Sequence, residues 1–523
     1  MKKIKIALVK PPATYADWYK RPVIGLSFIS ASLEKAGVEC KIFDALYQSW
    51  SEEKLVQQVE AYRPDMVGLT AMTHEITPAT RIAKTLKDRS NQITTVVGGA
   101  HIAALPKGTL EEFSIFDYGI YGEGEKTIEE LIKFLFDRNS ELDIHAIDGL
   151  VHRNKDQVIV NQQRPGLTSE EMENFPFPAF HQYYGDNTKA LAGRDSYYVI
   201  YTARGCPYKC SFCMTVLGKQ LRGASIERVV EEVEYAISHY GAHTINFSDE
   251  IFLFNSKRTK SLLQLMIDRG LHKKIRWSGL TRVNMVVMKG GEELIALAKE
   301  SGCYNLEMGV ESGDNDILKS INKGMTAEDA KEAVKIIKSN NISLGTYYIL
   351  GQPNETRETA QKTIDLAAEL NTNTIAVGIM VPYPGTEIAK MAKRGEAGYR
   401  LLTEDWTEYD KYGARSLELK NLSYQELLKF QKKAYFKMYL KNFRLFDMLR
   451  FTWERKSALW YFFKKKMRPL LTSDKSISSM ASQPVTLATT KHSLADVGPH
   501  RFIKSSPADT GPNRHLQRDG RPA

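Results

Sequence analysis

The chain has 523 residues, enough for two or three domains that each bury a hydrophobic core. Its 42% hydrophobic and 26% charged residues are typical of a globular protein. The formal net charge of +10 is modest for this length, so we expect no nucleic-acid partner. We recognise no secretory signal and no apolar run near the ~20 residues of a membrane span, so a cytoplasmic location is expected.

The N-terminal part of the chain alternates predicted strands with helices. We expect strands at residues 4–9, 38–43, 66–70 and 94–98, and a first helix at residues 25–36. This alternation favours a parallel, doubly wound sheet, in which ligands bind outside the carboxyl ends of the strands. No Gly-x-Gly-x-x-Gly follows the first strand, which argues against a dinucleotide site.

Small and polar residues follow the strands of this predicted sheet. Because glycine lets backbone amides approach a ligand closely, we expect this edge to bind a large cofactor with amide side groups. The alternative is a regulatory domain that holds no ligand. The candidate contacts are Thr70, Thr73, Gly98, Gly99, Gly122, Glu123 and Gly124. His74 and His101 lie in the same loops, and lone loop histidines are more often solvated than coordinating.

A second series of strands and helices begins near Tyr197, after a hairpin-like segment at residues 150–160. The predicted strands span residues 198–203, 244–248, 275–280, 304–310, 343–350 and 373–381. Six such units predict a partial parallel barrel with its active site at the carboxyl ends of the strands. Five polar residues follow these strands, namely Asp249, Glu250, Arg282, Glu311 and Ser312.

Three of the five cysteines, Cys206, Cys210 and Cys213, follow the first strand of this barrel within eight positions. Three thiolates can hold three irons of a cube-shaped [4Fe–4S] cluster and leave the fourth iron open to a small molecule. A zinc knuckle or a disulfide is the alternative, but no histidine or fourth cysteine stands nearby at zinc-ligand spacing. Cys40 and Cys303 lie in apolar stretches and are expected to be buried thiols of a reduced protein.

The C-terminal third changes character after Glu396. Residues 428–468 are rich in lysine, arginine and large aromatic side chains, so they are expected either to lie on an anionic membrane surface or to form a helical cap on the barrel. Residues 472–523 are rich in Ser, Thr, Pro and Gly without periodicity, which is typical of a disordered tail.

The Cys-x3-Cys-x-Phe-Cys run, with Gly205, Pro207 and Phe212, resembles the signature of the radical S-adenosylmethionine (SAM) enzymes. The Pro11-Pro12 pair, Gly98-Gly-Ala-His101 and Gly122-Glu-Gly-Glu125 are similar to the cobalamin-binding domain of the B12-dependent members of that family. The resemblance implies three cofactors, which are a [4Fe–4S] cluster, SAM and cobalamin. The Asp-x-His-x-x-Gly motif that gives a histidine to cobalt in other B12 proteins is absent here.

The resemblance also implies roles for residues at the strand ends. Cys206, Cys210 and Cys213 would be the catalytic cysteines that hold the cluster. Phe212, Asp249, Glu250, Arg282, Glu311 and Ser312 would contact SAM. Asp249-Glu250 replaces the family's usual Gly-Gly-Glu, which leaves open which carboxylate meets the methionyl amine. Arg282 is equally well explained by a salt bridge at the barrel rim.

The function implied is a cobalamin-dependent radical SAM methyltransferase that methylates an unactivated carbon of a small molecule. An external donor of the flavodoxin or ferredoxin type would reduce its cluster. One alternative is an oxidative cyclase similar to the anaerobic magnesium-protoporphyrin monomethyl ester cyclases. A second is a ligand-sensing protein with a structural cluster.

The predicted fold class is α/β, with a cobalamin-binding Rossmann-like domain, a partial (β/α)6 barrel and a C-terminal helical region. The expected boundaries are residues 1–140, 141–190 (a linker with the hairpin), 191–395, 396–471 and 472–523.

Overall fold

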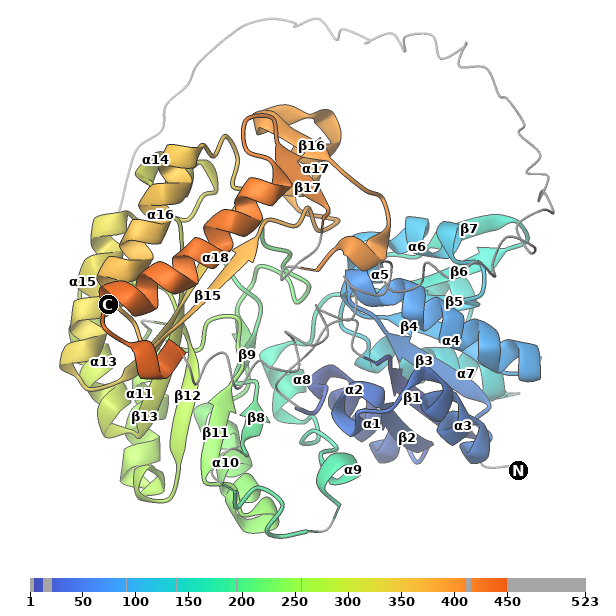
Figure 1. The fold of residues 1–523 in the computed structure, drawn as a ribbon. Helices are drawn as coiled ribbons and strands as arrows, with labels where there is room; N and C mark the ends of the chain where they lie inside the picture. Colours follow the sequence, from blue (N-terminus) through green and yellow to red (C-terminus); the bar gives the residue numbers. More distant parts are fainter. Residues whose placement is uncertain are drawn as a thin grey trace, which may run out of the picture. The chain divides into compact units, whose positions relative to one another are not determined.

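The computed structural model describes eight ranges of the chain, which are residues 4–12, 21–90, 92–137, 139–185, 187–193, 196–254, 256–410 and 415–448. The predicted tail at 472–523 and residues 449–468 of the basic, aromatic stretch lie outside these ranges. The described residues contain the two α/β sheets that the sequence predicts (Figure 1).

The N-terminal sheet has seven strands in the order β2-β1-β3-β4-β5-β6-β7. Its first five strands pair in parallel, which confirms the doubly wound prediction. They are β1 (Lys5–Lys10), β2 (Glu39–Asp44), β3 (Met66–Thr70), β4 (Thr94–Gly98) and β5 (Tyr118–Ile120). Strands β6 (Leu150–Asn154) and β7 (Gln157–Val160) form the predicted hairpin, and β6 pairs antiparallel with β5, so the hairpin extends this sheet.

Alternate residues of the parallel strands bury themselves on opposite faces of the N-terminal sheet. Ile6 and Leu8 pack against α1 (Ile24–Lys35) and α7 (Glu125–Phe136). Ala7 and Val9 pack against α3 (Glu52–Tyr62) and α4 (Ile76–Arg89). A sheet that is buried on both faces requires apolar side chains at successive positions, which the sequence of β1 supplies.

The second sheet has six strands in the order β15-β14-β13-β12-β11-β8, all of them parallel. Its strands are β8 (Tyr198–Ile200), β11 (Thr244–Phe247), β12 (Arg276–Thr281), β13 (Cys303–Glu311), β14 (Ser343–Leu350) and β15 (Thr374–Ile379). The helices between them are α10 (Ile226–Tyr240), α11 (Lys257–Asp268), α12 (Val283–Val287), α13 (Gly291–Glu300), α14 (Asn315–Ser320), α15 (Ala327–Ser339) and α16 (Arg357–Leu370). The open arrangement confirms the predicted partial barrel.

The chain leaves the barrel sheet earlier than the sequence predicts. Strand β8 ends at Ile200, and Ala203–Arg204 form a separate short strand, β9. β9 pairs antiparallel with β10 (Arg222–Gly223), and this ribbon encloses the cysteine-bearing residues between its two strands. Because a two-residue strand has almost no hydrophobic pattern, periodicity alone does not separate it from β8.

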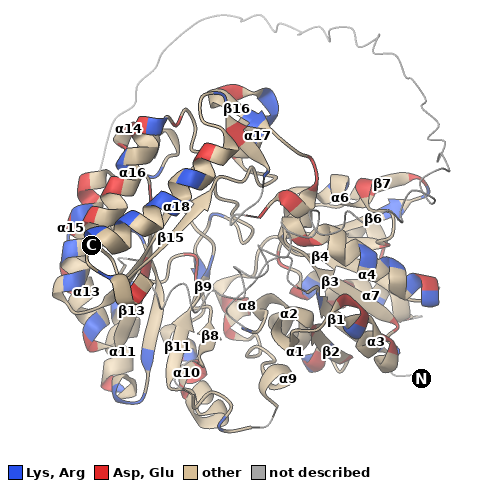
Figure 2. Cartoon of the chain, viewed as in Figure 1, with Lys and Arg blue, Asp and Glu red and all other residues tan. Residues whose placement is uncertain are grey.

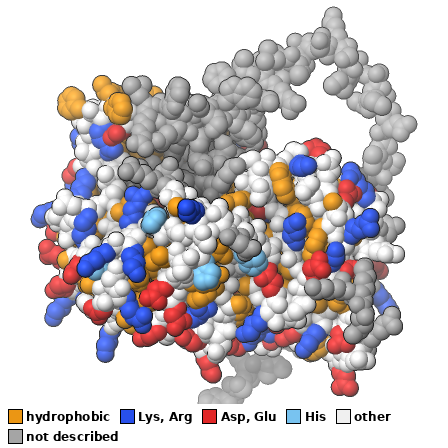
Figure 3. Space-filling model, turned by 90° about the horizontal axis from the view of Figure 1, so that it is seen from below, with side chains coloured by type: hydrophobic (Ala, Val, Ile, Leu, Met, Phe, Trp, Pro, Cys, Tyr) orange, Lys and Arg blue, Asp and Glu red, His pale blue; other side chains and the backbone are white. Residues whose placement is uncertain are grey.

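A β-hairpin precedes the expected C-terminal helix. Helix α17 (Glu387–Arg394) is followed by β16 (Tyr399–Leu401) and β17 (Leu417–Leu419), which pair antiparallel, and then by α18 (Tyr424–Lys441). α18 packs on α16 and β15. Residues of both charges lie along α15 and α16 (Figure 2), and the face in Figure 3 also mixes basic, acidic and scattered apolar side chains.

One buried acid in the barrel gives a pH-dependent stability prediction. Burial raises the pKa of Glu232, in α10, to about 8, while the nearby Arg228 lowers that pKa. The folded protein therefore keeps a proton that the unfolded chain releases, and the free energy of unfolding falls as the pH rises from about 4.5 to about 8. Glu232→Gln should remove on the order of 2 to 4 kcal/mol of this decline.

Thermal unfolding followed by circular dichroism between pH 5 and pH 8 measures this effect. Glu231→Gln, an exposed neighbour in the same helix, is the matched control and should keep the wild-type slope. Identical slopes for Glu232→Gln and Glu231→Gln would contradict the prediction.

Candidate functional site

Cys206, Cys210 and Cys213 lie on one loop that the β9–β10 ribbon closes at its base. The Cys206 amide donates to the Gly218 carbonyl at 3.1 Å, and the Cys213 amide donates to the Cys210 carbonyl at 3.1 Å. Gly205 has φ +95°, and a Cβ there would lie 2.2 Å from the Gln220 carbonyl oxygen, so this position requires glycine. The loop therefore presents its three thiols from an anchored backbone.

The three thiols influence one another electrostatically. Partial burial of the Cys213 thiol, together with the neighbouring Cys210 and Cys206, raises the pKa of Cys213 to about 11. Burial also raises the pKa of Cys206. Within the described ranges, no three Cys, His, Asp or Glu side chains converge as ligands of one metal ion. A cube-shaped cluster needs no such convergence, because its thiolates bind three different irons and bound iron favours the thiolate form.

Two cationic side chains flank the cysteine loop. The Arg282 guanidinium donates from Nη1 to Cys210 Sγ at 3.3 Å and from Nη2 to the Lys323 carbonyl at 2.5 Å, and it stacks 3.7 Å from the centre of the Tyr208 ring. Lys323 Nζ pairs with Glu311 Oε1 at 2.7 Å and lies 5.9 Å from the centre of the Phe212 ring. Arg282 thus contacts the cysteine loop, which neither of its two expected roles included.

The paired acids after β11 have different surroundings. Asp249 is buried and accepts hydrogen bonds from the Thr202 amide at 2.6 Å and from the Thr202 hydroxyl at 2.5 Å. Burial raises the pKa of Asp249 to about 7 and also raises the pKa of Glu250. Glu250 Oε2 is buried without a hydrogen-bond partner in the described part of the chain. Asp249 is therefore engaged in holding the chain after β8, whereas Glu250 keeps an acceptor for a ligand.

Glu311 and Ser312 end β13 in an irregular conformation. Glu311 has φ +71°, which is unusual for a residue with a side chain, and the β13–β14 register shifts between Gly309 and Glu311. A Cβ on Gly309 would lie 2.1 Å from Glu311 Oε1, so the glycine makes room for this carboxylate. Ser312 is fully buried, and its Oγ lies 3.1 Å from Thr363 Oγ1, so it packs against α16.

A cavity of about 250 Å³ lies at the carboxyl edge of the N-terminal sheet. Its lining includes six of the seven predicted contacts, which are Thr70, Gly98, Gly99, Gly122, Glu123 and Gly124. Apolar walls come from Leu8, Leu26 and Ile29, and the segment that leads to the cysteines contributes Tyr201 and Arg204. Thr73 is buried in the 3-10 turn Thr73–Glu75 and is not among the lining residues.

Several glycines line this cavity, so no side chain at these positions fills the space that a cofactor would occupy. Gly99 has φ +96°, and a Cβ there would lie 2.8 Å from both the nitrogen and the oxygen of Ala71, so only glycine fits. The enclosed volume is smaller than the roughly 300–1,000 Å³ usual for ligand pockets, so a ligand the size of cobalamin would extend beyond this cavity.

The two loop histidines correct the expectation that such residues are solvated, since both are buried. His101 lies between Phe113, at 6.3 Å between ring centres, and Trp406, at 5.0 Å. Burial lowers the pKa of His101 to about 4. Neither histidine is among the residues that line the cavity, so this conformation directs neither ring at a ligand there.

Several charged residues of the site were not identified from the sequence. Arg204 pairs with Glu123 and Glu125, each at 2.8 Å, and Arg222 pairs with Glu123 at 2.5 Å. Arg204 stands directly before the Gly-Cys-Pro run, and this adjacency was the available signal. Lys323 comes from the turn after α14 and has no motif that would identify it.

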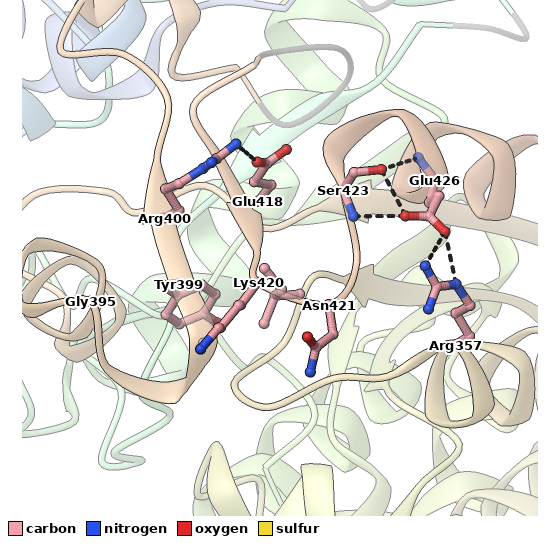
Figure 4. A pocket seen from close by; sticks show the side chains of 11 residues that line it. Arg357, Gly395, Tyr399, Arg400, Glu418, Lys420, Asn421, Ser423 and Glu426 are labelled. Atoms are coloured by element: carbon pink, nitrogen blue, oxygen red, sulfur yellow. Dashed lines mark hydrogen bonds and ion pairs between the residues drawn. The ribbon is translucent and has the colours of Figure 1, made fainter.

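A second cavity, of about 630 Å³, lies between the β16–β17 hairpin and the start of α18. Figure 4 shows two ion pairs among its charged side chains, Arg400 with Glu418 and Arg357 with Glu426, and draws no interaction for Lys420. None of the predicted site residues lines this cavity.

Comparisons with known families match both parts of the site. Residues 19–132 match the B12 binding domain, and residues 200–367 match the radical SAM superfamily. An uncharacterized methyltransferase of Pyrococcus horikoshii is 32% identical over 449 residues, covering 84% of this chain and 94% of that protein. The anaerobic magnesium-protoporphyrin IX monomethyl ester cyclase of Cereibacter sphaeroides is 26% identical, covering 80% of this chain and 67% of that protein.

Two solved structures share the fold. OxsB, a cobalamin-dependent SAM radical enzyme solved with aqua-cobalamin and SAM bound, gives a TM-score of 0.68 at 17% identity, covering 90% of this chain and 72% of that chain. The methyltransferase TsrM from Kitasatospora setae, solved with cobalamin and a [4Fe-4S] cluster bound, gives a TM-score of 0.62 at 19% identity, covering 83% and 85%.

The Glu311–Lys323 pair leads to a stability prediction. Lys323→Met leaves the Glu311 carboxylate buried without its cation, which should lower the free energy of unfolding by about 3 kcal/mol. Urea unfolding of the protein before cluster reconstitution measures this loss. Lys319→Met, at an exposed position nearby, should unfold like the wild type. Equal urea midpoints for Lys323→Met and Lys319→Met would show that the buried pair contributes nothing to the free energy of unfolding.

Proposed function

Since the chain belongs to the B12-binding radical SAM enzymes, we propose that it methylates an unactivated carbon of a small-molecule substrate. Its cofactors are a [4Fe–4S] cluster, SAM and cobalamin. One observation carries the proposal, which is that the glycine-lined cavity and the cysteine loop adjoin through Tyr201 and Arg204. When bound, the reduced cluster supplies the electron that cleaves SAM to methionine and a 5′-deoxyadenosyl radical, and cobalamin supplies the methyl group.

Different residues around the cysteine loop bind the cluster and different parts of SAM in this proposal. We assign Cys206, Cys210 and Cys213 to three irons of the cluster. Glu250 accepts from the methionyl ammonium, since its Oε2 lacks a partner in the described residues, and Asp249 positions the chain through Thr202. Glu311, which Lys323 holds in place, accepts from the ribose hydroxyls. In this proposal the methionyl amine meets Glu250 rather than Asp249, a choice that the sequence left open.

The exposed side of the cluster receives an electron from a separate donor in this proposal. Cys213 is exposed and Cys206 and Cys210 are partly buried, so a small redox protein of the flavodoxin or ferredoxin type has a short path to the iron. The expected domain boundaries near residues 190 and 395 are kept in the proposal, and the expected boundary near residue 140 is moved. The pairing of β6 with β5 supports a boundary after the hairpin, near residue 160.

Oxidative cyclisation is the second candidate, and the 26% identity to the Cereibacter cyclase favours keeping it. Both reactions begin with hydrogen abstraction by the deoxyadenosyl radical, so they differ in how the substrate radical is consumed. A methyl transfer needs a second SAM to restore the methyl donor, and a cyclisation does not. The methyltransferase relative covers more of both chains, which supports methyl transfer.

Product stoichiometry distinguishes the two reactions. Methyl transfer should yield one 5′-deoxyadenosine and one S-adenosylhomocysteine per turnover, and deuterium from the SAM methyl group should appear in the product. Liquid chromatography with mass spectrometry measures all three species. Formation of 5′-deoxyadenosine without an equal amount of S-adenosylhomocysteine, together with an unlabelled and oxidised substrate, would assign the chain to the cyclase reaction.

The proposed SAM contacts give a more local test. Glu250→Gln should raise the Kd for SAM at least ~10-fold, because a charge-assisted hydrogen bond to the ammonium is lost, while iron and cobalamin contents stay at the wild-type level. Anaerobic calorimetry measures the affinity. Glu227→Gln, in the first turn of α10, is the control and should keep the wild-type Kd. An unchanged Kd in Glu250→Gln would refute the assignment.

Most of α18 and the residues that follow it, to position 448, form the described part of the stretch expected to contact a membrane. Five apolar side chains are exposed within eleven residues, and Phe443 and Phe446 are 92% and 80% exposed. They are Phe436, Leu440, Phe443, Leu445 and Phe446. Exposed lysines lie beside them at Lys432, Lys433 and Lys441. No described helix is long and apolar enough to cross a membrane. We propose that this surface rests on anionic lipid, since its charge complements such a headgroup layer.

Sedimentation with vesicles tests this surface. The full chain should bind phosphatidylcholine vesicles that contain about 30% phosphatidylserine, bind pure phosphatidylcholine at least ~10-fold more weakly, and lose binding in Phe443→Ser/Phe446→Ser. Met288→Ser, an exposed apolar position elsewhere, should not change binding. Absence of vesicle binding by the wild type would refute the proposal, and a concentration-dependent dimer lost in the double variant would assign the surface to a second copy.

A further inference from the structure

Four charged side chains form a buried network where the N-terminal sheet meets the cysteine loop. Arg204 Nη1 lies 2.8 Å from Glu123 Oε2 and 2.8 Å from Glu125 Oε1, and Arg222 Nη2 lies 2.5 Å from Glu123 Oε1. The side chains of Arg204, Glu123 and Glu125 are each less than 8% exposed, and that of Arg222 is 12% exposed. Two positive charges thus balance two negative charges away from water.

The two arginines come from directly opposed positions of one ribbon. Arg204 of β9 pairs in register with Arg222 of β10, and this ribbon closes the base of the cysteine loop. Arg204 is separated from Cys206 by Gly205 alone, which is held against the Gln220 carbonyl. Movement of the Arg204 backbone is therefore transmitted to the first cysteine.

The two glutamates come from the glycine loop that borders the N-terminal cavity. Gly122, Glu123, Gly124 and Glu125 all line that cavity, together with Arg204 itself. Glu123 Oε2 also accepts from the Leu167 amide at 3.2 Å, and Arg222 donates to the Leu167 carbonyl at 2.6 Å. The network therefore joins the cavity edge to the ribbon in two ways, directly through the ion pairs and indirectly through the backbone of Leu167.

Further contacts fix the orientation of both guanidinium groups. Arg204 stacks over the Phe28 ring of α1 at 4.7 Å, and Arg222 donates to the Leu217 carbonyl at 2.8 Å. A Cβ on Gly166 would lie 2.3 Å from Arg222 Nη1, so a glycine makes room for this side chain. A lysine at position 204 keeps the charge but lacks the planar fork that reaches two carboxylates and stacks on a ring.

We propose that Arg204 is a positioning residue that sets the separation between the cobalamin site and the cluster site. This inference rests on the proposed function, since it takes the glycine loop as the cobalamin edge and the three cysteines as the cluster ligands. Transfer of a methyl group to a radical that forms near SAM requires that the two cofactors keep a narrow range of separations. A buried and charge-balanced network is stiff because breaking its ion pairs leaves uncompensated charge away from water.

The distance between the two cofactors is measurable without turnover. Cob(II)alamin and the one-electron-reduced cluster are both paramagnetic, so pulsed dipolar electron paramagnetic resonance of the holoenzyme gives a distribution of separations. The wild type should give one narrow distribution. Arg204→Met should broaden it at least ~2-fold while cobalamin and iron contents per chain stay within ~20% of the wild type, and Arg204→Lys should give an intermediate width.

Two further variants keep the test decisive. Glu125→Gln weakens the network while leaving Glu123 in place and should broaden the distribution even if Arg204→Met fails to fold. Arg81→Met removes an exposed arginine that pairs with Glu52 and should leave the width unchanged. Wild-type widths in both Arg204→Met and Glu125→Gln would overturn the inference. A wild-type protein that binds only one cofactor would instead refute the proposed function.

Discussion

Parallel strand pairing is the constraint on which both sites of this protein depend. In a parallel sheet every strand ends at the same edge, so the loops that follow successive strands emerge side by side. The N-terminal sheet thereby brings Thr70, Gly98 and Gly122 to one cavity. The barrel sheet brings the cysteine loop, Glu250, Arg282 and Glu311 to another edge, although more than one hundred residues separate the first of these from the last.

Buried charge shapes the chemistry at these edges. The site contains Arg204, Glu123, Lys323 and Glu311 with side chains at most 8% exposed, and each would cost several kcal/mol to bury alone. Each has a partner of opposite charge, so the cost is offset only while the pairs stay intact. Glu250 differs, because one of its oxygens is buried without a partner in the described structure. An unsatisfied acceptor beside the cysteine loop is what a site prepared for a cationic ligand requires.

The sequence predicted the features that depend on periodicity or on motif spacing. All six barrel strands and the parallel N-terminal strands follow from alternation of strand and helix patterns, and the cysteine loop follows from its spacing. The features it missed depend on contacts between distant segments. Burial of His101 requires Trp406 from a turn about three hundred residues later, and the contact of Arg282 with Cys210 requires the exact path of the loop. The early end of β8 depends on a two-residue ribbon, which leaves no periodic signal.

All the chemistry proposed for this protein requires that Cys206, Cys210 and Cys213 hold a [4Fe–4S] cluster that cleaves SAM. Iron content and deoxyadenosine formation after anaerobic reconstitution can be measured in the wild type and in a variant with all three cysteines replaced by alanine. We expect about four irons per chain and SAM cleavage in the wild type, and neither in the triple variant, while Cys40→Ala/Cys303→Ala retains both. Retention of iron and of SAM cleavage in the triple variant would refute this role of the three cysteines.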